Sequence, residues 1–154
     1  MTYNALIYDL ERVIRLILRY PQGLSILLGA VPPPASMDIV DAFPGRAFDS
    51  LGIRGGRRPQ AERRVEAADR IDDTIRKAGG WGHIVSAVCQ WKKENPDDWS
   101  MMAAHISWFG HGQRWISRAK LSKLAAGYGC SERTISRKRN AFPGVIADYI
   151  LFYA

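Results

Sequence analysis

Apolar residues recur every three or four positions over several long stretches of the chain, a period typical of amphipathic α-helices. The first stretch, from Tyr3 to Tyr20, has a broad apolar stripe with arginines outside it and ends at Pro21. The other predicted helices cover residues 24–30, 60–77, 81–93 and 98–109, and a last segment that starts at Pro143-Gly144. We therefore predict an all-α protein, folded as a compact helical bundle.

Residues 31–59 interrupt this pattern because prolines and glycines are dense there. The segment includes Pro32-Pro33-Pro34, Pro44, Gly45, Gly52, Gly55, Gly56 and Pro59. Such residues favour turns and loops, so we predict a long Pro/Gly-rich loop with short helical turns around Met37 to Ala42. The chain then divides into an N-terminal helix with this loop, residues 1–60, and a helical body, residues 61–154.

Residues 121–140, LSKLAAGYGCSERTISRKRN, have the spacing of a helix-turn-helix that reads DNA, and the whole motif covers about 117–140. Three apolar residues at helical spacing give its first helix one apolar face: Leu121, Leu124 and Ala125. Gly127 and Gly129 supply positions for positive φ, which allow a sharp turn. Ser131 suits the N-cap of a second helix, which we predict from about Glu132 to Asn140.

The second helix of this motif has donor-rich side chains on its outer side, while Ile135 faces the first helix. Such side chains reach base edges and phosphates in a major groove. Three positions after Ile135, where such helices usually have another apolar residue, the chain has Lys138, so we expect a short helix or one held by Phe142. The candidate DNA-binding residues are Arg118, Lys120, Lys123, Ser131, Arg133, Thr134, Ser136, Arg137, Lys138, Arg139 and Asn140.

The net charge of the protein, +7, is concentrated on this motif. From Arg114 to Arg139 there are eight basic residues and one acid, Glu132, whereas the rest of the chain has 14 basic and 14 acidic residues. A local excess of positive charge is the electrostatic footprint of a surface that binds a polyanion. This distribution favours nucleic-acid binding over the alternative, a plain helical hairpin with a solvated basic face.

Two other charged clusters give weaker signals. Arginines flank the Gly55-Gly56 pair and form a candidate arm for RNA polymerase or RNA, with a simple mobile loop as an equal alternative. The residues of this arm are Arg54, Arg57 and Arg58. Asp69, Asp72 and Asp73 are close enough in sequence to bind a metal ion, but they alternate with arginines as on an ordinary solvated helix face. We predict no catalytic residue, metal or cofactor.

Cysteine usage and hydropathy indicate a soluble protein of the cytoplasm. Cys89 and Cys130 lie far apart on different predicted elements, which suggests neither a disulfide framework nor a redox motif. Asp9, Glu11 and Arg12 interrupt the N-terminal apolar stretch, so it does not read as a signal peptide. No apolar run reaches the roughly 20 residues that span a bilayer, and we expect no membrane contact.

Between Val88 and Leu151, an Asn-Pro-Asp-Asp-Trp opening (Asn95 to Trp99) precedes a helix, a glycine loop and the helix-turn-helix. This order of parts resembles the C-terminal half of phage late-gene transcription antitermination proteins of the Q type. It is also similar, more loosely, to region 4 of sigma factors. The resemblance covers under half of the chain, and the cysteine-based zinc module that some antiterminators carry has no counterpart in it.

The resemblance implies a factor that binds a DNA element at a phage late promoter, loads onto RNA polymerase paused just downstream, and travels with it through terminators. Its partners would be double-stranded DNA, bacterial RNA polymerase with or without a sigma factor, and nascent RNA, at the nucleoid of the bacterial host. In this role the residues that face bases are Arg133, Ser136, Arg137 and Asn140. Those that hold phosphates are Arg118, Lys120, Lys123, Lys138 and Arg139.

Three alternatives remain open at this stage. A conventional helix-turn-helix repressor or activator would use the same motif without travelling with polymerase. A DNA-packaging or recombination accessory protein would use it within a ring or filament. The third alternative, an enzyme that uses Asp69, Asp72 and Asp73, is the one that the sequence favours least.

Overall fold

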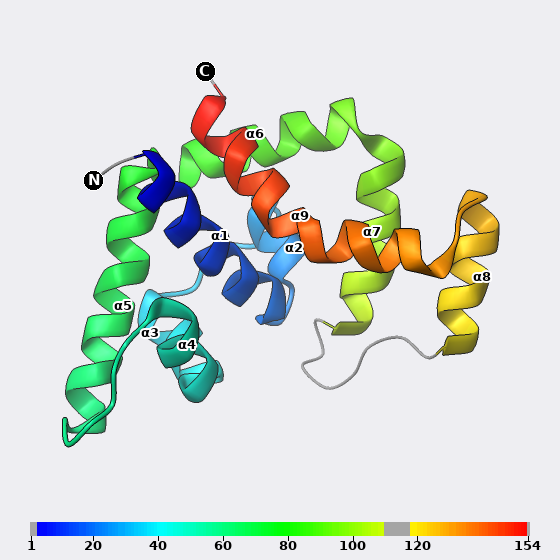
Figure 1. Ribbon diagram of the computed structural model, residues 1–154. Helices are drawn as coiled ribbons and strands as arrows, with labels where there is room; N and C mark the ends of the chain where they lie inside the picture. Colours follow the sequence, from blue (N-terminus) through cyan, green and yellow to red (C-terminus); the bar gives the residue numbers. More distant parts are fainter. Residues whose placement is uncertain (1–2, 110–117, 154) are drawn as a thin grey trace.

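The computed structural model describes residues 3–109 and 118–153, and within them the chain forms nine α-helices and no strand (Figure 1). The all-α class predicted from the apolar period is therefore confirmed. The helices are α1 (Tyr3–Arg19), α2 (Gly23–Leu27), α3 (Ser36–Ala42), α4 (Pro44–Leu51), α5 (Gln60–Lys77), α6 (Gly80–Glu94), α7 (Pro96–Phe109), α8 (Arg118–Tyr128) and α9 (Glu132–Phe152).

Most helix bounds agree with the predicted ones to within one or two residues. The range of α5 is the predicted one, and α7 begins at Pro96, two residues early, because proline suits the first turn of a helix. Not every apolar residue of α5 is buried. Val65 is 51% exposed, whereas Ile71 and Ile75 are buried. The N-terminal end of α5 lies at the outer edge of the molecule, where few helices cover it (Figure 1).

A single core joins the two halves of the chain. Helix α1 packs along α9 and against α5, and both α6 and α7 also pack on α9. Buried residues of α1, such as Ile14 and Ile17, belong to the same apolar cluster as Ile146 and Ile150 of α9. In Figure 1, α9 (orange to red) accordingly crosses the molecule from α8 at one end to the N-terminal end of α1 at the other. Segments from residues 1–60 and 61–154 thus share one core.

Three aromatic rings fasten the middle of α9 to its neighbours. Phe142 of α9 lies with its ring centroid 5.6 Å from that of Trp91 in α6 and 6.0 Å from that of Trp99 in α7. The two tryptophan rings are 6.3 Å apart, and all three pairs meet edge to face, an arrangement that aromatic quadrupoles favour. Phe142 therefore holds this helix. This is one of the two outcomes expected from Lys138 in place of an apolar residue, and the other, a short helix, is wrong because α9 extends to Phe152.

The segment predicted as a long loop contains two helices, α3 and α4. The turn expected around residues 37–42 is α3, but α4 was not foreseen. It starts at Pro44, whose fixed φ suits a first helical position, and ends at Gly52, whose φ of 69° lets the chain turn away. Phe48 and Leu51 are buried as α4 packs on α5. Burial of these side chains stabilises a helix that the prolines and glycines had masked.

The prediction of a short second helix ending near Asn140, followed by a separate last helix, is wrong. Residues 132–152 form one helix, with Pro143 inside it. Proline lacks the N–H that would bond the carbonyl of Arg139, a loss that destabilises a helix interior. Here Pro143 is buried along with Phe142 and Ile146, and this packing offsets the missing hydrogen bond.

None of the helices in residues 3–109 and 118–153 combines the length and the apolar character needed to cross a membrane. The two cysteines of the chain are free and half-buried. Cys89 points its thiol at the carbonyl oxygen of Leu28, with 3.4 Å between Sγ and O. Cys130 packs beside the turn that joins α8 to α9, as a small and largely apolar side chain.

Candidate nucleic-acid interface

The turn between α8 and α9 is built by backbone hydrogen bonds at the end of α8. Gly129 has a φ of 65°, and its N–H donates to the carbonyl of Ala126 (3.2 Å), while the N–H of Cys130 donates to that of Ala125 (3.0 Å). This pair of bonds with a left-handed residue is a Schellman motif, which satisfies the last carbonyls of a helix. Gly127, also predicted to have a positive φ, is instead an ordinary residue of α8, so that expectation is wrong.

Ser131 caps the second helix, as predicted. Its backbone is extended (φ −82°, ψ 157°), and its Oγ accepts a hydrogen bond from the N–H of Thr134 at 3.1 Å. The hydroxyl of Thr134 also lies 3.0 Å from Ser131 Oγ. The bond to Ser131 satisfies an N–H that a helix start otherwise leaves without a partner. Both hydroxyls are therefore already engaged in capping α9, and a contact with DNA would be an additional hydrogen bond.

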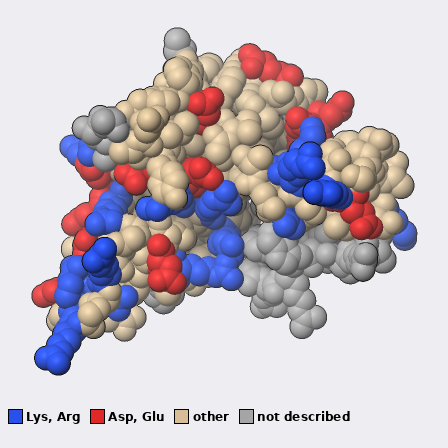
Figure 2. Space-filling model, viewed as in Figure 1, with Lys and Arg blue, Asp and Glu red and all other residues tan. Residues whose placement is uncertain are grey.

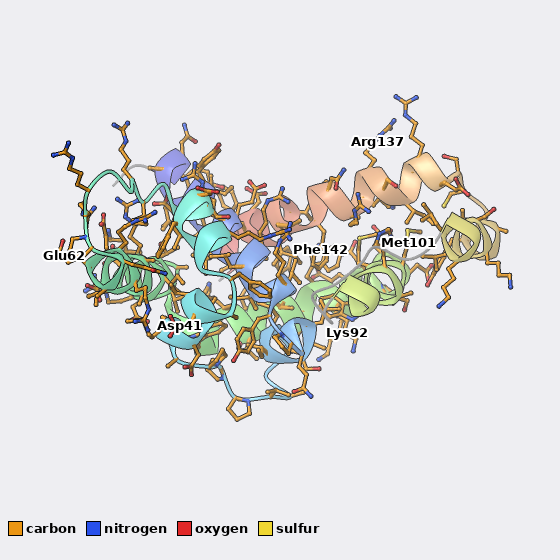
Figure 3. All side chains as sticks on the ribbon, turned by 90° about the horizontal axis from the view of Figure 1, so that it is seen from below. Asp41, Glu62, Lys92, Met101, Arg137 and Phe142 are labelled. Atoms are coloured by element: carbon orange, nitrogen blue, oxygen red, sulfur yellow. The ribbon has the colours of Figure 1, made fainter. Side chains whose placement is uncertain are left out.

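A stripe of polar side chains runs along the outer face of the first half of α9. Arg133, Ser136, Arg137 and Asn140 have the spacing i, i+3, i+4 and i+7, which aligns them on one face, opposite the fully buried Ile135. We call these four residues the recognition stripe. Arg133, Arg137 and Asn140 are exposed, Ser136 is half-buried, and Arg137 projects away from the body of the protein (Figure 3).

Lys138, a predicted phosphate contact, lies on the flank of the stripe and is paired within the protein. Its Nζ lies 2.6 Å from Oδ1 of Asp98 in the first turn of α7. Both side chains are about two-fifths exposed, so the pair is partly solvated and contributes modestly to stability. The pair links α9 to α7, and contact between Lys138 and a phosphate would require exchange of this partner.

Arg139, on the other flank, contacts the buried His105 of α7, with 2.9 Å between Arg139 Nη1 and His105 Nε2. A guanidinium can only donate hydrogen bonds, so Nε2 is the acceptor and the ring proton is on Nδ1. Arg139 also donates to Oδ1 of Asn140 at 3.3 Å. Burial, and secondarily the charge of Arg139, lower the pKa of His105 from 6.5 to about 4. His105 is therefore neutral at physiological pH.

This neutral histidine predicts a loss of stability in mild acid. Because the pKa of His105 is lower in the folded protein, the unfolded chain binds the proton first as the pH falls from about 6.5 to about 4. Between about pH 7 and about pH 5, we expect the wild type to lose up to about 2 kcal/mol of unfolding free energy relative to His105→Gln, which can accept the bond from Arg139 without titrating. Urea unfolding of both proteins across this pH range measures the difference. Parallel pH profiles would contradict the assignment.

The other candidate DNA-binding residues belong to α8. Lys120 and Lys123 are exposed on this helix, while its apolar residues Leu121 and Leu124 are half-buried and Ala125 is buried. The predicted apolar face of the first helix is thus turned toward the core. The side chain of Arg118, the remaining candidate, lies outside the described residues.

The candidate arm lies between α4 and α5. Arg54, Arg57 and Arg58 are exposed, and Nη2 of Arg58 pairs with Glu66 Oε2 at 2.5 Å. In Figure 3 this loop lies on the same side of the molecule as Arg137, but at the opposite end. The structure therefore brings the arm and the recognition stripe to one face without bringing them into contact.

Two of the three aspartates of α5, Asp72 and Asp73, are engaged with their neighbours. Asp72 accepts a hydrogen bond from Ser36 of α3, and Asp73 pairs with Arg76 and, at 2.7 Å, with Lys77. Within residues 3–109 and 118–153, no three histidine, cysteine or acidic side chains come close enough together to hold a metal ion.

Compared with protein-family models, with curated proteins and with solved structures, the chain has no match.

Proposed function

We propose that the protein binds double-stranded DNA through α8 and α9, used as a helix-turn-helix whose second helix enters the major groove. The observation that carries this proposal is the recognition stripe, with two exposed arginines and an asparagine on a helix whose opposite face is anchored in the core. Arginine reads guanine and asparagine reads adenine from the major groove. The capped start of α9 and the charge of residues 114–139 add further support.

In the cell, this DNA binding serves transcription antitermination, on the resemblance to late-gene antiterminators of the Q type. The factor binds at a late promoter, loads onto RNA polymerase paused nearby and lets it read through terminators. Two parts shared with that family meet in the structure, because Asp98 and Trp99 of the Asn-Pro-Asp-Asp-Trp opening contact Lys138 and Phe142 of α9. The supporting helix thus positions the helix proposed to read DNA.

Two variants separate base reading from phosphate binding. After the preferred site is selected from random duplexes, Arg137→Ala should weaken binding to it by about 1–3 kcal/mol and relax its sequence preference. Lys123→Ala, on the exposed side of α8, should weaken binding to all sequences and lower the slope of log K against log salt by about 0.9. Fluorescence anisotropy with the selected and a scrambled duplex measures both. Equal losses on the two duplexes for Arg137→Ala would refute its assignment as a base contact.

Transcription in vitro tests the antitermination step. An intrinsic terminator placed behind the native late promoter is transcribed by bacterial RNA polymerase with and without the protein. Readthrough that depends on promoter-proximal DNA supports the proposal, and the DNA-binding variant Arg137→Ala should reduce it. A change in initiation alone, with termination unaffected, would indicate a conventional helix-turn-helix repressor or activator instead.

A further inference from the structure

The N-terminal helix α1 has an arginine-rich outer face that the predicted DNA-binding set did not include. Arg12, Arg15 and Arg19 are spaced i, i+3 and i+7, so they lie on one side of the helix. The opposite side, with Leu10, Ile14 and Ile17, is buried in the core. Since α1 packs along α9, this arginine face lies beside the helix that carries the recognition stripe.

Arg15 touches the end of the recognition stripe directly. Its Nη2 donates to the backbone carbonyl of Asn140 at 3.1 Å and to Oε1 of Glu11 at 2.8 Å. Within the described part of the chain, the other donors of this guanidinium have no hydrogen-bond partner, and the side chain is 45% exposed. The carbonyl of Asn140 therefore fixes an arginine, with donors to spare, at the point where the stripe ends.

The positive charge continues from Arg15 across the molecule. Arg12, one turn back on α1, packs over the ring of Tyr8 at 4.2 Å and forms no ion pair with any described residue. Its guanidinium reaches Gly52, where a Cβ would lie 4.0 Å from Arg12 Nη1. Arg70 of α5 lies by the same glycine, but it pairs with Glu66 and donates to the carbonyl of Leu51. The charge that no described acid neutralises here is therefore that of Arg12, and it can bind an anionic ligand.

The length of the recognition stripe places these arginines at a phosphate backbone. From Arg133 to Asn140 the helix rises about 10 Å, close to the width of about 12 Å of the major groove. Base contacts come from the first turns of a recognition helix, so Asn140 is the last residue of the stripe to face a base, and groups beyond it approach the phosphates of the groove wall. Figure 2 shows Lys and Arg side chains over α1 and over the first half of α9 on the same face of the molecule.

We propose that Arg15 and Arg12 of α1 form a second contact surface for the same DNA duplex, where they bind phosphates beyond the end of the recognition stripe. The inference rests on the proposed function and extends it to the N-terminal half of the chain. Glu11 offsets part of the charge of Arg15, but this face keeps a positive excess. Because Arg15 is bonded to the backbone of Asn140, the position of the recognition stripe in the groove would also fix the position of Arg15 at the phosphates.

The test is the salt dependence of binding to a random-sequence duplex of about 30 base pairs, roughly three helical turns. For Arg15→Gln we expect the slope of log K against log salt to fall by about 0.9, and for the double variant with Arg12→Gln by about twice as much. Arg15→Lys, which keeps the charge, should retain the wild-type slope. The matched control is Arg64→Gln, since Arg64 is paired with Asp41, which lies on the side of the molecule away from Arg137 (Figure 3).

The outcomes separate this inference from the proposed function. If Arg15→Gln leaves the slope unchanged while Arg137→Ala weakens binding, the second surface is refuted and the helix-turn-helix proposal stands. If Arg64→Gln lowers the slope as much as Arg15→Gln, the effect is one of net charge and the inference is equally refuted. If the wild type binds no DNA, both proposals are wrong. Thermal unfolding of each variant ensures that folded proteins are compared.

Discussion

Phe142→Ala is expected to destabilise the protein by about 3–5 kcal/mol, the range typical of buried aromatic side chains cut back to alanine. Phe142 is 3% exposed, and its ring is the contact shared by Trp91 and Trp99. Its removal leaves a cavity at the junction of α6, α7 and α9 and loses two edge-to-face contacts. Urea unfolding followed by tryptophan fluorescence measures the loss. DNA binding should fall with the fraction of folded protein.

A second phenylalanine on the same helix provides the control. Phe152 is 69% exposed and contacts Tyr3 with a ring distance of 5.1 Å, so Phe152→Ala should cost less than about 1 kcal/mol. Phe142→Leu, which keeps most of the apolar volume, should fall between the two. If Phe142→Ala were no more damaging than Phe152→Ala, the aromatic cluster would not be what holds the middle of α9.

Gly23→Ala is expected to cost about 3 kcal/mol, at the upper end for an overpacked site. A Cβ at Gly23 would lie 2.9 Å from the carbonyl carbon of Ile17 and closer still to its oxygen. Both atoms belong to the backbone of α1, so the turn from α1 into α2 would have to open, and the buried Ile26 and Leu27 would move with it. Chemical denaturation of the variant gives the loss.

Gly45→Ala is the matched control for this prediction. A Cβ at Gly45, in the first turn of α4, would meet no atom within 4 Å, and its φ is not positive. Alanine is a better helix former than glycine, so this change should leave the stability unaltered or raise it by about 0.5 kcal/mol. A similar loss for both variants would show that the close approach of α2 to α1 is not what requires glycine at position 23.

The helices that the sequence predicted well are those in which local pattern and burial agree. The apolar period of α1 and α5 gave their bounds, and the Gly79-Gly80 break between α5 and α6 has positive φ at both residues. Where local and tertiary preferences conflict, the prediction failed. Pro143-Gly144 reads as a helix break, but α1 and α6 pack against this part of α9 and keep it helical.

Sequence alone could predict the interactions within the candidate site that join residues close in the chain, but not those that join residues from distant helices. Ser131 and Gly129 act through hydrogen bonds within a few residues, so sequence alone could assign them. The pairing of Lys138 with Asp98 joins residues 40 positions apart and depends on where α7 lies. One signal for such partners was present in the sequence. Ile135 and Phe142 mark the buried face of the helix, and Lys138 and Arg139 lie on either side of that face, where they can reach a neighbouring helix.

Because α9 is one continuous helix, the angle around its axis between the recognition stripe and the buried residues is fixed. Each residue of a helix advances the face by about 100°. A single residue inserted between Asn140 and Ile146 would therefore rotate Arg133 and Arg137 to another side of the helix unless Ile146 and Ile150 left the core. A loop between the two parts would absorb such an insertion. If α9 reads DNA as proposed, the spacing between its base-contacting and its packing residues would therefore be a fixed part of the specificity.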